Sequence, residues 1–329
     1  MTEILNVLLK TSVSGGIVIL FWFITYPVSR RVFRASWHYT VLKFSMLPLV
    51  LPLALLIPQP KTAADIPAFP AVSMIPLIPQ DLGLQYLVLI LPFVAMMLAV
   101  IEINKVLRLY KFIAISCADE ADNQILEVFN TCKERMNMRR KIELKTSEHI
   151  KTPFTVGLFK PVIYMPKTDI SHEEIELSLI HELTHIKNGD LWFKFFSVII
   201  SILHWFNPLV HLLRIKISAV SEFYCDERVT ADMTKKERMN YGELLIKTAY
   251  GENPSNKSLY APLSHSSKKI IKRLSHLMNT RKPHKIVTVF SVIIIITVFV
   301  FAAVQAIAPN RAYRDVGLPQ TFFVVEISQ

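Results

Sequence analysis

The sequence predicts an integral membrane protein in which four transmembrane helices carry a cytosolic domain of mixed helices and strands. Hydrophobic residues make up 52% of the 329 residues, and the mean hydropathy is +0.37; both values are high for a soluble domain. Four stretches stay apolar for about the 20 residues that a helix needs to cross the hydrocarbon core. Between the last two of them, residues 104–285 are long enough to fold as a separate α+β domain.

The four predicted spans are not equally well marked. The first is too long, and its end too basic, for a signal peptide that is removed. Pro48 and Pro52 are expected to kink the second span. The last is the clearest, because isoleucine and valine fill its centre. The spans are residues 5–26, 39–57, 84–103 and 286–307.

Lysine and arginine in the short loops predict the orientation of the spans, because these residues concentrate on the cytosolic side. Loop 27–38 is basic and is expected in the cytosol, whereas the Pro-rich loop 58–83 is expected outside. Residues 104–285 are basic at both ends and are therefore cytosolic, and the N-terminus and the tail 308–329 face outward. The net charge of +11 fits this topology and an anionic inner leaflet, without nucleic acid as a direct partner.

Periodicity in the cytosolic region predicts one amphipathic helix, at residues 120–137, and then three short strands. Prolines at both ends mark the last strand as an edge or short strand. An edge strand of this kind either holds a peptide by strand addition or only supports its neighbouring helix. The strands are expected at residues 142–146, 154–158 and 162–165.

One motif carries the chemistry of the chain: residues 181–185 read H-E-x-x-H. On a helix, His181 and His185 share a face and can offer two imidazole nitrogens to one metal ion. Two neutral nitrogens and an open position suit a catalytic Zn²⁺, and Glu182 would accept the proton of the water that the metal activates. The alternative is a polar helix turn whose histidines only form hydrogen bonds in a core.

A helix is predicted around this motif from its own boundary signals. Ser171 and Glu174 resemble a capping box at its start, and residues 188–190 read as its stop. Apolar residues recur between them at helical spacing, so one side of the helix is expected to be buried. These residues are Ile175, Leu179, Leu183 and Ile186.

A third metal ligand is expected from a second helix that carries Glu222 and, four residues later, Asp226. Glu222 would complete a His₂Glu site that leaves a fourth position for water. Asp226 would then form a hydrogen bond to a ligand histidine from outside and hold its tautomer. Cys225 competes for the metal, but a closed site with that thiolate would be structural and inert.

Residues 191–213 are apolar enough to suggest a fifth span. A single crossing would place ligands before and after it on opposite sides of the membrane, so this segment is expected to dip in and return or to pack near the surface. His204 and His211 are interpreted as polar groups satisfied within this hairpin rather than as metal ligands. The three cysteines are expected to be free thiols of a reducing compartment: Cys117, Cys132 and Cys225.

Three pieces together resemble the BlaR/MecR-type integral-membrane zinc metallopeptidases of the gluzincin group. They are the H-E-L-T-H motif, the H-W-F-N-P stretch at residues 204–208, and Glu222-x-x-x-Asp226. The similarity extends to residues 152–166 and covers nearly the whole chain. It implies a gluzincin fold for the cytosolic domain, one Zn²⁺ per chain on His181, His185 and Glu222, and Glu182 as the catalytic base.

The resemblance also implies a role in signalling. In such proteins an outer domain senses a β-lactam antibiotic, and the cytosolic protease then cuts itself and brings about the loss of a DNA-binding repressor. Their self-cleavage segment corresponds loosely to the stretch around Ser266. Residues 308–329 are too few for a folded penicillin-binding sensor, so this domain is expected to be missing from the chain.

The sequence thus predicts a multi-pass membrane zinc metalloendopeptidase that regulates antibiotic resistance by cutting itself, a cytosolic regulator such as a repressor, or both. Two alternatives stay open: a constitutive quality-control metalloprotease and a non-catalytic signalling scaffold stabilised by zinc. The expected partners are the lipid bilayer and a protein or peptide substrate, and a homo-oligomer is left open. Residues 267–279 are expected to form a basic amphipathic helix on the inner leaflet.

Overall fold

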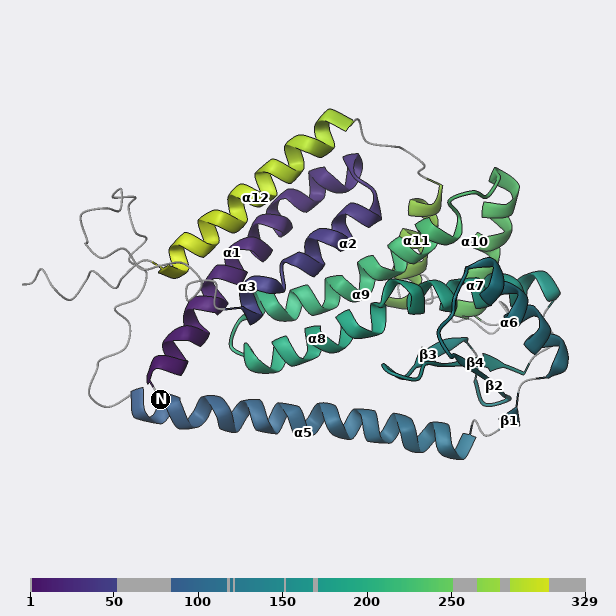
Figure 1. Cartoon of the computed structure of the whole chain (residues 1–329), viewed down its shortest axis with the longest axis horizontal. Helices are drawn as coiled ribbons and strands as arrows, with labels where there is room; N and C mark the ends of the chain where they lie inside the picture. Colours follow the sequence, from purple (N-terminus) through teal and green to yellow (C-terminus); the bar gives the residue numbers. More distant parts are fainter. Residues whose placement is uncertain are drawn as a thin grey trace, which may run out of the picture.

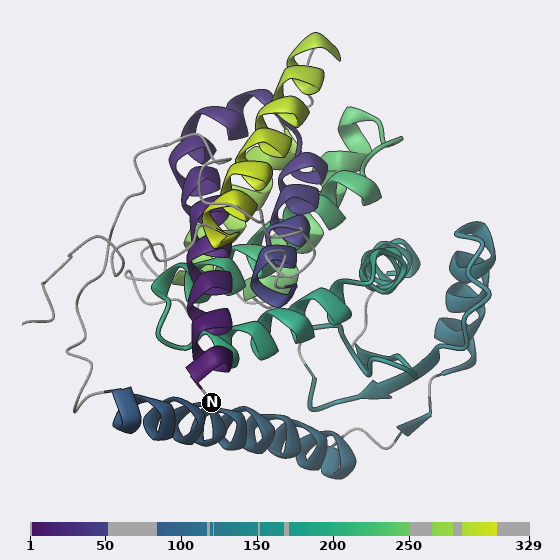
Figure 2. The ribbon, with the colours of Figure 1, turned by 60° about the vertical axis from the view of Figure 1, so that its left-hand side comes forward.

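The computed structural model describes residues 2–51, 84–116, 119–120, 122–150, 152–167, 171–250, 265–278 and 285–307. It is mostly helical, with a helix bundle at one end and a small sheet with its helices at the other (Figure 1). Helices α1 (Thr2–Val32) and α12 (Lys285–Ile307) lie side by side in the bundle. Helix α5 (Leu84–Ser116) runs along one side of the molecule in both ribbon views (Figure 2).

Two helices of the described chain are long and apolar enough to cross a membrane, by length and composition: Val7–Val32 and Ile90–Ile115. They overlap the first and third predicted spans, residues 5–26 and 84–103, and both extend beyond the predicted ends, to Val32 and Ile115. Within α12, the stretch Ser291–Ala302 is a shorter apolar helix. The second predicted span is not one helix in its described part: α2 (Ala35–Phe44) and α3 (Leu47–Val50) are separated at residues 45–46, and Pro48 lies in the first turn of α3. The outer loop 58–83 and the tail 308–329 lie outside the described residues.

The sheet has four described strands in the order β1-β2-β4-β3. β4 (Val162–Pro166) pairs with β2 (Glu143–Ser147) in parallel and with β3 (Phe154–Val156) in antiparallel fashion, while β1 (Asp119–Glu120) pairs antiparallel with β2. Of the two expectations for the strand at residues 162–165, an edge strand or a short strand, the first was wrong: β4 has five residues and lies between β2 and β3. Its prolines lie at or just before its ends, where a missing N–H is tolerated, and the outer strands of the described sheet are β1 and β3.

Helices α6 (Asn123–Arg135) and α7 (His172–Asn188) cover the sheet, and Figure 2 shows α7 end-on above the strands. The predicted capping box at the start of α7 is confirmed, because the Ser171 hydroxyl accepts from the Glu174 N–H and the Glu174 carboxylate accepts from the Ser171 N–H. The apolar residues at helical spacing in α7 pack against strand β4 and α6, as expected. This packing holds the motif helix rigidly on the sheet. The buried residues of this core are Val128, Phe129, Cys132, Ile142, Ile163, Met165, Ile175, Leu179, Ile180, Leu183 and Ile186.

Gly189 ends α7 in a left-handed conformation with φ of 71° and directly precedes α8 (Asp190–Leu203). We expect Gly189→Ala to lower the free energy of unfolding by about 1–2 kcal/mol, since a Cβ disfavours this φ. No atom lies within 4 Å of the added Cβ, so the loss is conformational and not steric. Chemical unfolding of the full chain in detergent measures it.

Gly16→Ala is the matched control for this change, because Gly16 lies inside helix α1 and its added Cβ would meet neighbours at 3.5 Å, an ordinary contact. This variant should be as stable as the wild type or slightly more stable. Equal stability of Gly189→Ala and Gly16→Ala would contradict the assignment of a left-handed helix cap.

Residues 191–213 form a helical hairpin: α8 turns back into α9 (Pro208–Val229). Helix α9 runs back beside α8, so the segment turns and returns, as the sequence predicts. Its turn packs on the bundle, because the His204 ring Nε2 lies 3.0 Å from the Leu49 carbonyl oxygen and the Asn207 amide donates to Ser12. His211 Nε2 lies 2.8 Å from the carbonyl oxygen of Trp205. The contacts of His204 and Asn207 therefore tie the hairpin to α3 and α1, whereas His211 is bonded within the hairpin.

Helices α10 (Lys235–Tyr250) and α11 (His265–Leu277) follow α9 in the described chain, and α11 packs against both α9 and α10. Ile270 and Leu277, on the apolar side of α11, are buried against the protein, and the basic Lys272 is exposed. The expected amphipathic helix is therefore present, and Ile270 and Leu277 on its apolar side pack against α9 and α10. Ile271 and Met278 on that side are exposed, so contact of this helix with the inner leaflet stays a prediction.

Candidate metal centre

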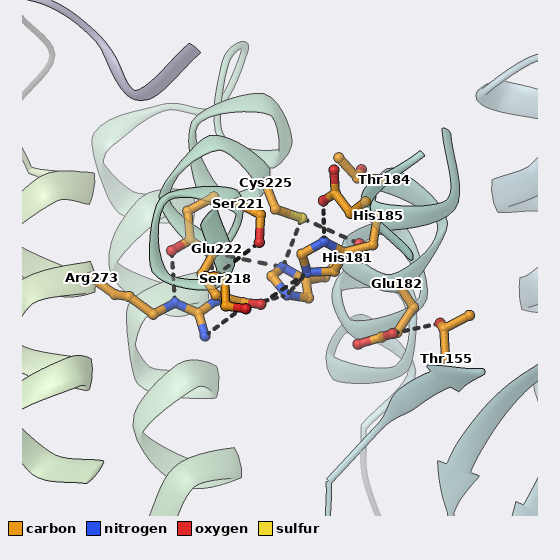
Figure 3. Close-up of polar contacts among 12 residues, drawn as sticks. Thr155, His181, Glu182, Thr184, His185, Ser218, Ser221, Glu222, Cys225 and Arg273 are labelled. Atoms are coloured by element: carbon orange, nitrogen blue, oxygen red, sulfur yellow. Dashed lines mark hydrogen bonds and ion pairs between the residues drawn. The ribbon is translucent and has the colours of Figure 1, made fainter. Parts of the chain in front are cut away.

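Helix α7 brings the two motif histidines together, because residues four apart share a helix face. Nε2 of His181 and Nε2 of His185 lie 3.2 Å apart. Both rings are largely buried and point toward α9 (Figure 3). Two imidazole nitrogens therefore converge on one point next to a second helix.

Glu222 approaches that point from α9, as predicted. One carboxylate oxygen lies 3.6 Å from Nε2 of His181 and the other 3.6 Å from Nε2 of His185. These distances are too long for good hydrogen bonds. Ligand atoms bound about 2.1 Å from one tetrahedral ion lie about 3.4 Å apart, so the spacing of these three groups fits a zinc ion between them.

Cys225 offers a second ligand set, since donor atoms of His181, His185 and Cys225 all lie within 4.8 Å of one another. The Cys225 Sγ, however, lies 3.3 Å from Nδ1 of His181, at the opposite side of the ring from Nε2. It also donates to the His181 carbonyl oxygen at 3.3 Å. The Tyr241 hydroxyl occupies the same Nδ1 at 2.8 Å. The set with Glu222 fits a metal better, because its three groups meet on the Nε2 side of both rings.

The charges of this group favour a cation between the three side chains. Burial raises the pKa of Glu222, but the interactions of its carboxylate with the two nearby histidines outweigh burial and hold the pKa well below its ordinary value. Burial lowers the pKa of His181, whereas Cys225 and Glu222 raise it to about 10. A divalent ion bound between these groups would supply positive charge next to the carboxylate, and its binding would compete with protons for the imidazoles.

Asp190 contacts His185 at Nδ1, the ring nitrogen that does not face His181. In the sequence, Asp190 is recognisable only as part of a helix stop. Asp190 Oδ2 lies 2.5 Å from His185 Nδ1, and both side chains are buried. The other oxygen accepts from the hydroxyl of Tyr39 on α2 at 2.6 Å. A carboxylate on Nδ1 holds the tautomer that leaves Nε2 free for a metal.

Asp226 was expected to form a hydrogen bond to a ligand histidine directly, but it contacts His181 through the Tyr241 hydroxyl. Its Oδ1 lies 3.8 Å from His181 Nδ1, and the Tyr241 hydroxyl between them donates to Asp226 at 2.8 Å. Arg273 of α11 donates twice to the same carboxylate, at 2.8 and 2.6 Å, and its third nitrogen lies 3.5 Å from Glu222. Burial and the charge of Asp226 raise the pKa of Tyr241 well above its ordinary value, so the hydroxyl keeps its proton.

Glu182 stands beside the histidine pair and is held by the edge strand. Its Oε2 accepts from the Thr155 hydroxyl on β3 at 2.6 Å (Figure 3). The side chain is only 8% exposed and opens onto the same cavity as His181 and His185. Thr155 therefore aims the carboxylate into the cavity that the metal ligands also face.

This cavity has a volume of about 400 Å³ and lies between the edge strand β3 and helices α7, α8, α9, α10 and α11. Its size is that of an ordinary ligand site. Apolar side chains such as Leu177, Leu244 and Ile270 line it beside the charged groups. Lys194 of α8 adds a cation whose Nζ lies 3.5 Å from Glu222. The cavity can therefore accept an extended chain with apolar side chains next to the candidate metal centre.

The structure brings His181, Glu182, His185 and Glu222 together, with Asp226 one residue further out. Ser266 lies apart from them in the chain, in the first turn of α11, and residues 251–264 just before it are outside the described residues. Four residues near the site had no usable signal in the sequence, because each comes from a different element whose own pattern shows only its secondary structure. They are Tyr39, Thr155, Tyr241 and Arg273.

An H-E-x-x-H helix packed on a sheet, a facing carboxylate from a second helix and a cavity beside an edge strand define a protein of the metallopeptidase type. Comparison with known families agrees with this class. Residues 6–277 match the family described as BlaR1 peptidase M56, and the chain belongs to this family.

Similar proteins with curated names are regulatory and resistance proteins. The chain is 34% identical over 161 residues to the regulatory protein BlaR1 of Bacillus licheniformis, a match that covers 48% of this chain and 27% of that protein. It is 27% identical over 169 residues to the methicillin resistance mecR1 protein of Staphylococcus aureus, covering 50% of this chain and 28% of that protein. The matched segments thus cover less than a third of these relatives.

Proposed function

We propose that this chain is an integral-membrane zinc metalloendopeptidase with a regulatory role, which cuts itself, a cytosolic regulator such as a transcriptional repressor, or both. The observation that carries the proposal is the convergence of His181, His185 and Glu222 within 3.2 to 3.6 Å of one another, with Glu182 facing the same cavity. The cytosolic domain would then have a gluzincin fold with one Zn²⁺ per chain.

A zinc ion on these three ligands would lower the pKa of water to about 7 and polarise a peptide carbonyl. Glu182 supplies the base: its carboxylate takes a proton from the attacking water and returns it to the leaving amine. Thr155 keeps one carboxylate oxygen in place by its hydrogen bond of 2.6 Å. Asp190 and Tyr241 hold the Nδ1 atoms of the two histidines, so that both Nε2 atoms stay directed at the ion.

Strand β3 is the proposed binding edge for the substrate. Among the described strands β3 is paired only on the β4 side, so its other edge is open to an added strand. Thr155 lies in the middle of β3 and contacts Glu182. A peptide added along this edge would therefore pass Glu182, with its backbone held by hydrogen bonds.

The regulatory part of the proposal rests on the relatives, whose names denote a regulatory protein and a methicillin resistance protein. We further propose the multi-pass topology that the loop charges favour, with four spans, a cytosolic peptidase domain, and the N-terminus and C-terminal tail outside. Self-cleavage in the segment near Ser266 belongs to the same proposal.

A comparison of new protein N-termini in cells that express the wild type or Glu182→Gln tests this function. A regulatory peptidase should produce a few cleavages, including one in this chain, that the variant lacks and that depend on an added inducer. Many cleavages of misfolded proteins without an inducer would instead indicate quality control. If the two cell lines do not differ while the chain retains zinc, the proposed peptidase is wrong and a scaffold remains.

A further inference from the structure

Helix α2 of the bundle contacts both helices that carry the candidate metal ligands. Its Tyr39 reaches Asp190, the first residue of α8, and its Lys43 Nζ lies 3.4 Å from the carbonyl oxygen of Asn188, the last residue of α7. At its other end, the Ser36 N–H donates to Glu227 at 3.2 Å, five residues after Glu222 on α9. The helix therefore bridges the two sides of the candidate centre.

The contact through Tyr39 is the one that reaches a metal ligand. The Tyr39 hydroxyl donates to Asp190 Oδ1 at 2.6 Å, and Asp190 Oδ2 lies 2.5 Å from His185 Nδ1. Tyr39 and Asp190 are 1% and 0% exposed. A buried carboxylate needs such donors, and with two donors it is held in one orientation.

Neighbouring rings fix the position of the Tyr39 hydroxyl. The rings of Phe193 and Tyr224 flank that of Tyr39, at centroid distances of 6.4 and 5.2 Å. The Lys43 ammonium lies 4.0 Å from the centroids of both the Tyr39 and the Phe193 ring. Removal of the hydroxyl alone would thus leave the packing of α2 on α8 and α9 in place and change only the hydrogen bond to Asp190.

We propose that Tyr39 is a positioning residue for the metal centre: through Asp190 it holds His185 in the orientation that binds zinc, and it thereby couples helix α2 of the bundle to the site. This inference rests on the proposed function, since it assumes that His185 binds zinc. A displacement of α2 would change the hydrogen bond from Tyr39 to Asp190 and, through Asp190, the position of His185. The bundle and the metal centre would then respond to one another.

The test measures the dissociation constant of Zn²⁺ for the full chain in detergent, by competition with a chromophoric chelator. Tyr39→Phe should weaken zinc binding on the order of 10-fold and Asp190→Asn on the order of 100-fold, the range found for outer partners of metal ligands. Tyr26→Phe is the control. It removes a hydroxyl from α1 in the same bundle, where the Tyr26 ring packs against Trp22 and His38, and it should bind zinc like the wild type.

The double variant separates positioning from a general loss of structure. If Tyr39 acts through Asp190, adding Tyr39→Phe to Asp190→Asn should weaken zinc binding by less than 2-fold further, because the coupled effects are not additive. Unfolding of the zinc-free chains measures the stability that each variant loses; Tyr39→Phe should lose more than Tyr26→Phe, because it takes one donor from the buried Asp190 carboxylate. If Tyr39 has only a general structural role, the factors by which Tyr39→Phe and Asp190→Asn weaken zinc binding should multiply in the double variant.

The outcomes distinguish this inference from the proposed function. If the wild type binds zinc but Tyr39→Phe binds it equally well, or if the effects of Tyr39→Phe and Asp190→Asn multiply, the inference is overturned and the proposed function stands. If the wild type itself takes up no zinc, the proposed function is overturned and the inference with it. If Tyr39→Phe weakens zinc binding in the wild-type chain but has no further effect in the Asp190→Asn chain, the inference and the proposed function are both supported.

Discussion

Replacing Glu182 by glutamine is expected to slow peptide cleavage by roughly 10²–10⁴-fold while zinc binding stays unchanged. Glutamine keeps the shape of the side chain and can still accept from Thr155, but it cannot take a proton from water. Zinc binding should persist, because the three groups that converge on the candidate metal centre are His181, His185 and Glu222. Single-turnover cleavage by the purified chain and its zinc content by mass spectrometry measure the two quantities.

Thr155→Val provides a graded comparison for this variant. It removes the hydrogen bond of 2.6 Å that holds Glu182 but leaves the carboxylate, so the rate should fall by about 10-fold, as expected for a base that is less well oriented. A Glu182→Gln variant that cleaves at the wild-type rate would remove Glu182 from the mechanism. Loss of zinc in the same variant would instead mean that Glu182 is a ligand.

Glu222→Ala is expected to weaken zinc binding more than about 100-fold, whereas Cys225→Ser should leave it nearly unchanged. Even outer partners of metal ligands cost about 10–100-fold when they are lost, and Glu222 has its two oxygens 3.6 Å from the two histidine nitrogens. The Cys225 Sγ contacts Nδ1 of His181, which is not the nitrogen that faces the other two groups. Equilibrium competition with a chelator measures both affinities.

The two variants are matched, because both change a buried or half-buried side chain on the same face of α9, three residues apart. The zinc-free chains should unfold at similar denaturant concentrations, which controls for loss of the fold. If Cys225→Ser loses zinc and Glu222→Ala keeps it, the second ligand set is correct. The site would then be of the closed, structural kind that favours a scaffold.

Local features of the fold followed from the sequence because their causes are local. The capping box at Ser171 and the glycine stop at Gly189 depend on residues within one turn, and both occur as predicted. The spacing of His181 and His185 is likewise set by one helix. The return of the hairpin at residues 191–213 also followed from the sequence, since one crossing would have separated the ligands.

Other features depended on contacts between distant segments and were mistaken or missed. Strand β4 was read as an edge or short strand from its prolines, but it lies inside the sheet, because pairing partners decide which strand lies at the edge. The apolar face of α11 was assigned to the leaflet alone, but Ile270 and Leu277 on it pack against α9 and α10. Arg273, on the same helix, reaches Asp226 across 47 positions of the chain. Amphipathic periodicity shows that a face is buried and does not show by what.

The sequence by itself determined the candidate metal-binding groups of this protein: the helix that carries two histidines and a proposed base, the carboxylate that should join them, and the apolar stretches around them. Only the tertiary structure decided which groups support that chemistry. Tyr39, Thr155, Asp190 and Tyr241 act through single hydrogen bonds between elements that are far apart in the chain. A hydrogen bond of this kind requires a distance of about 3 Å, and such a distance is set by the packing of whole helices and not by any local pattern.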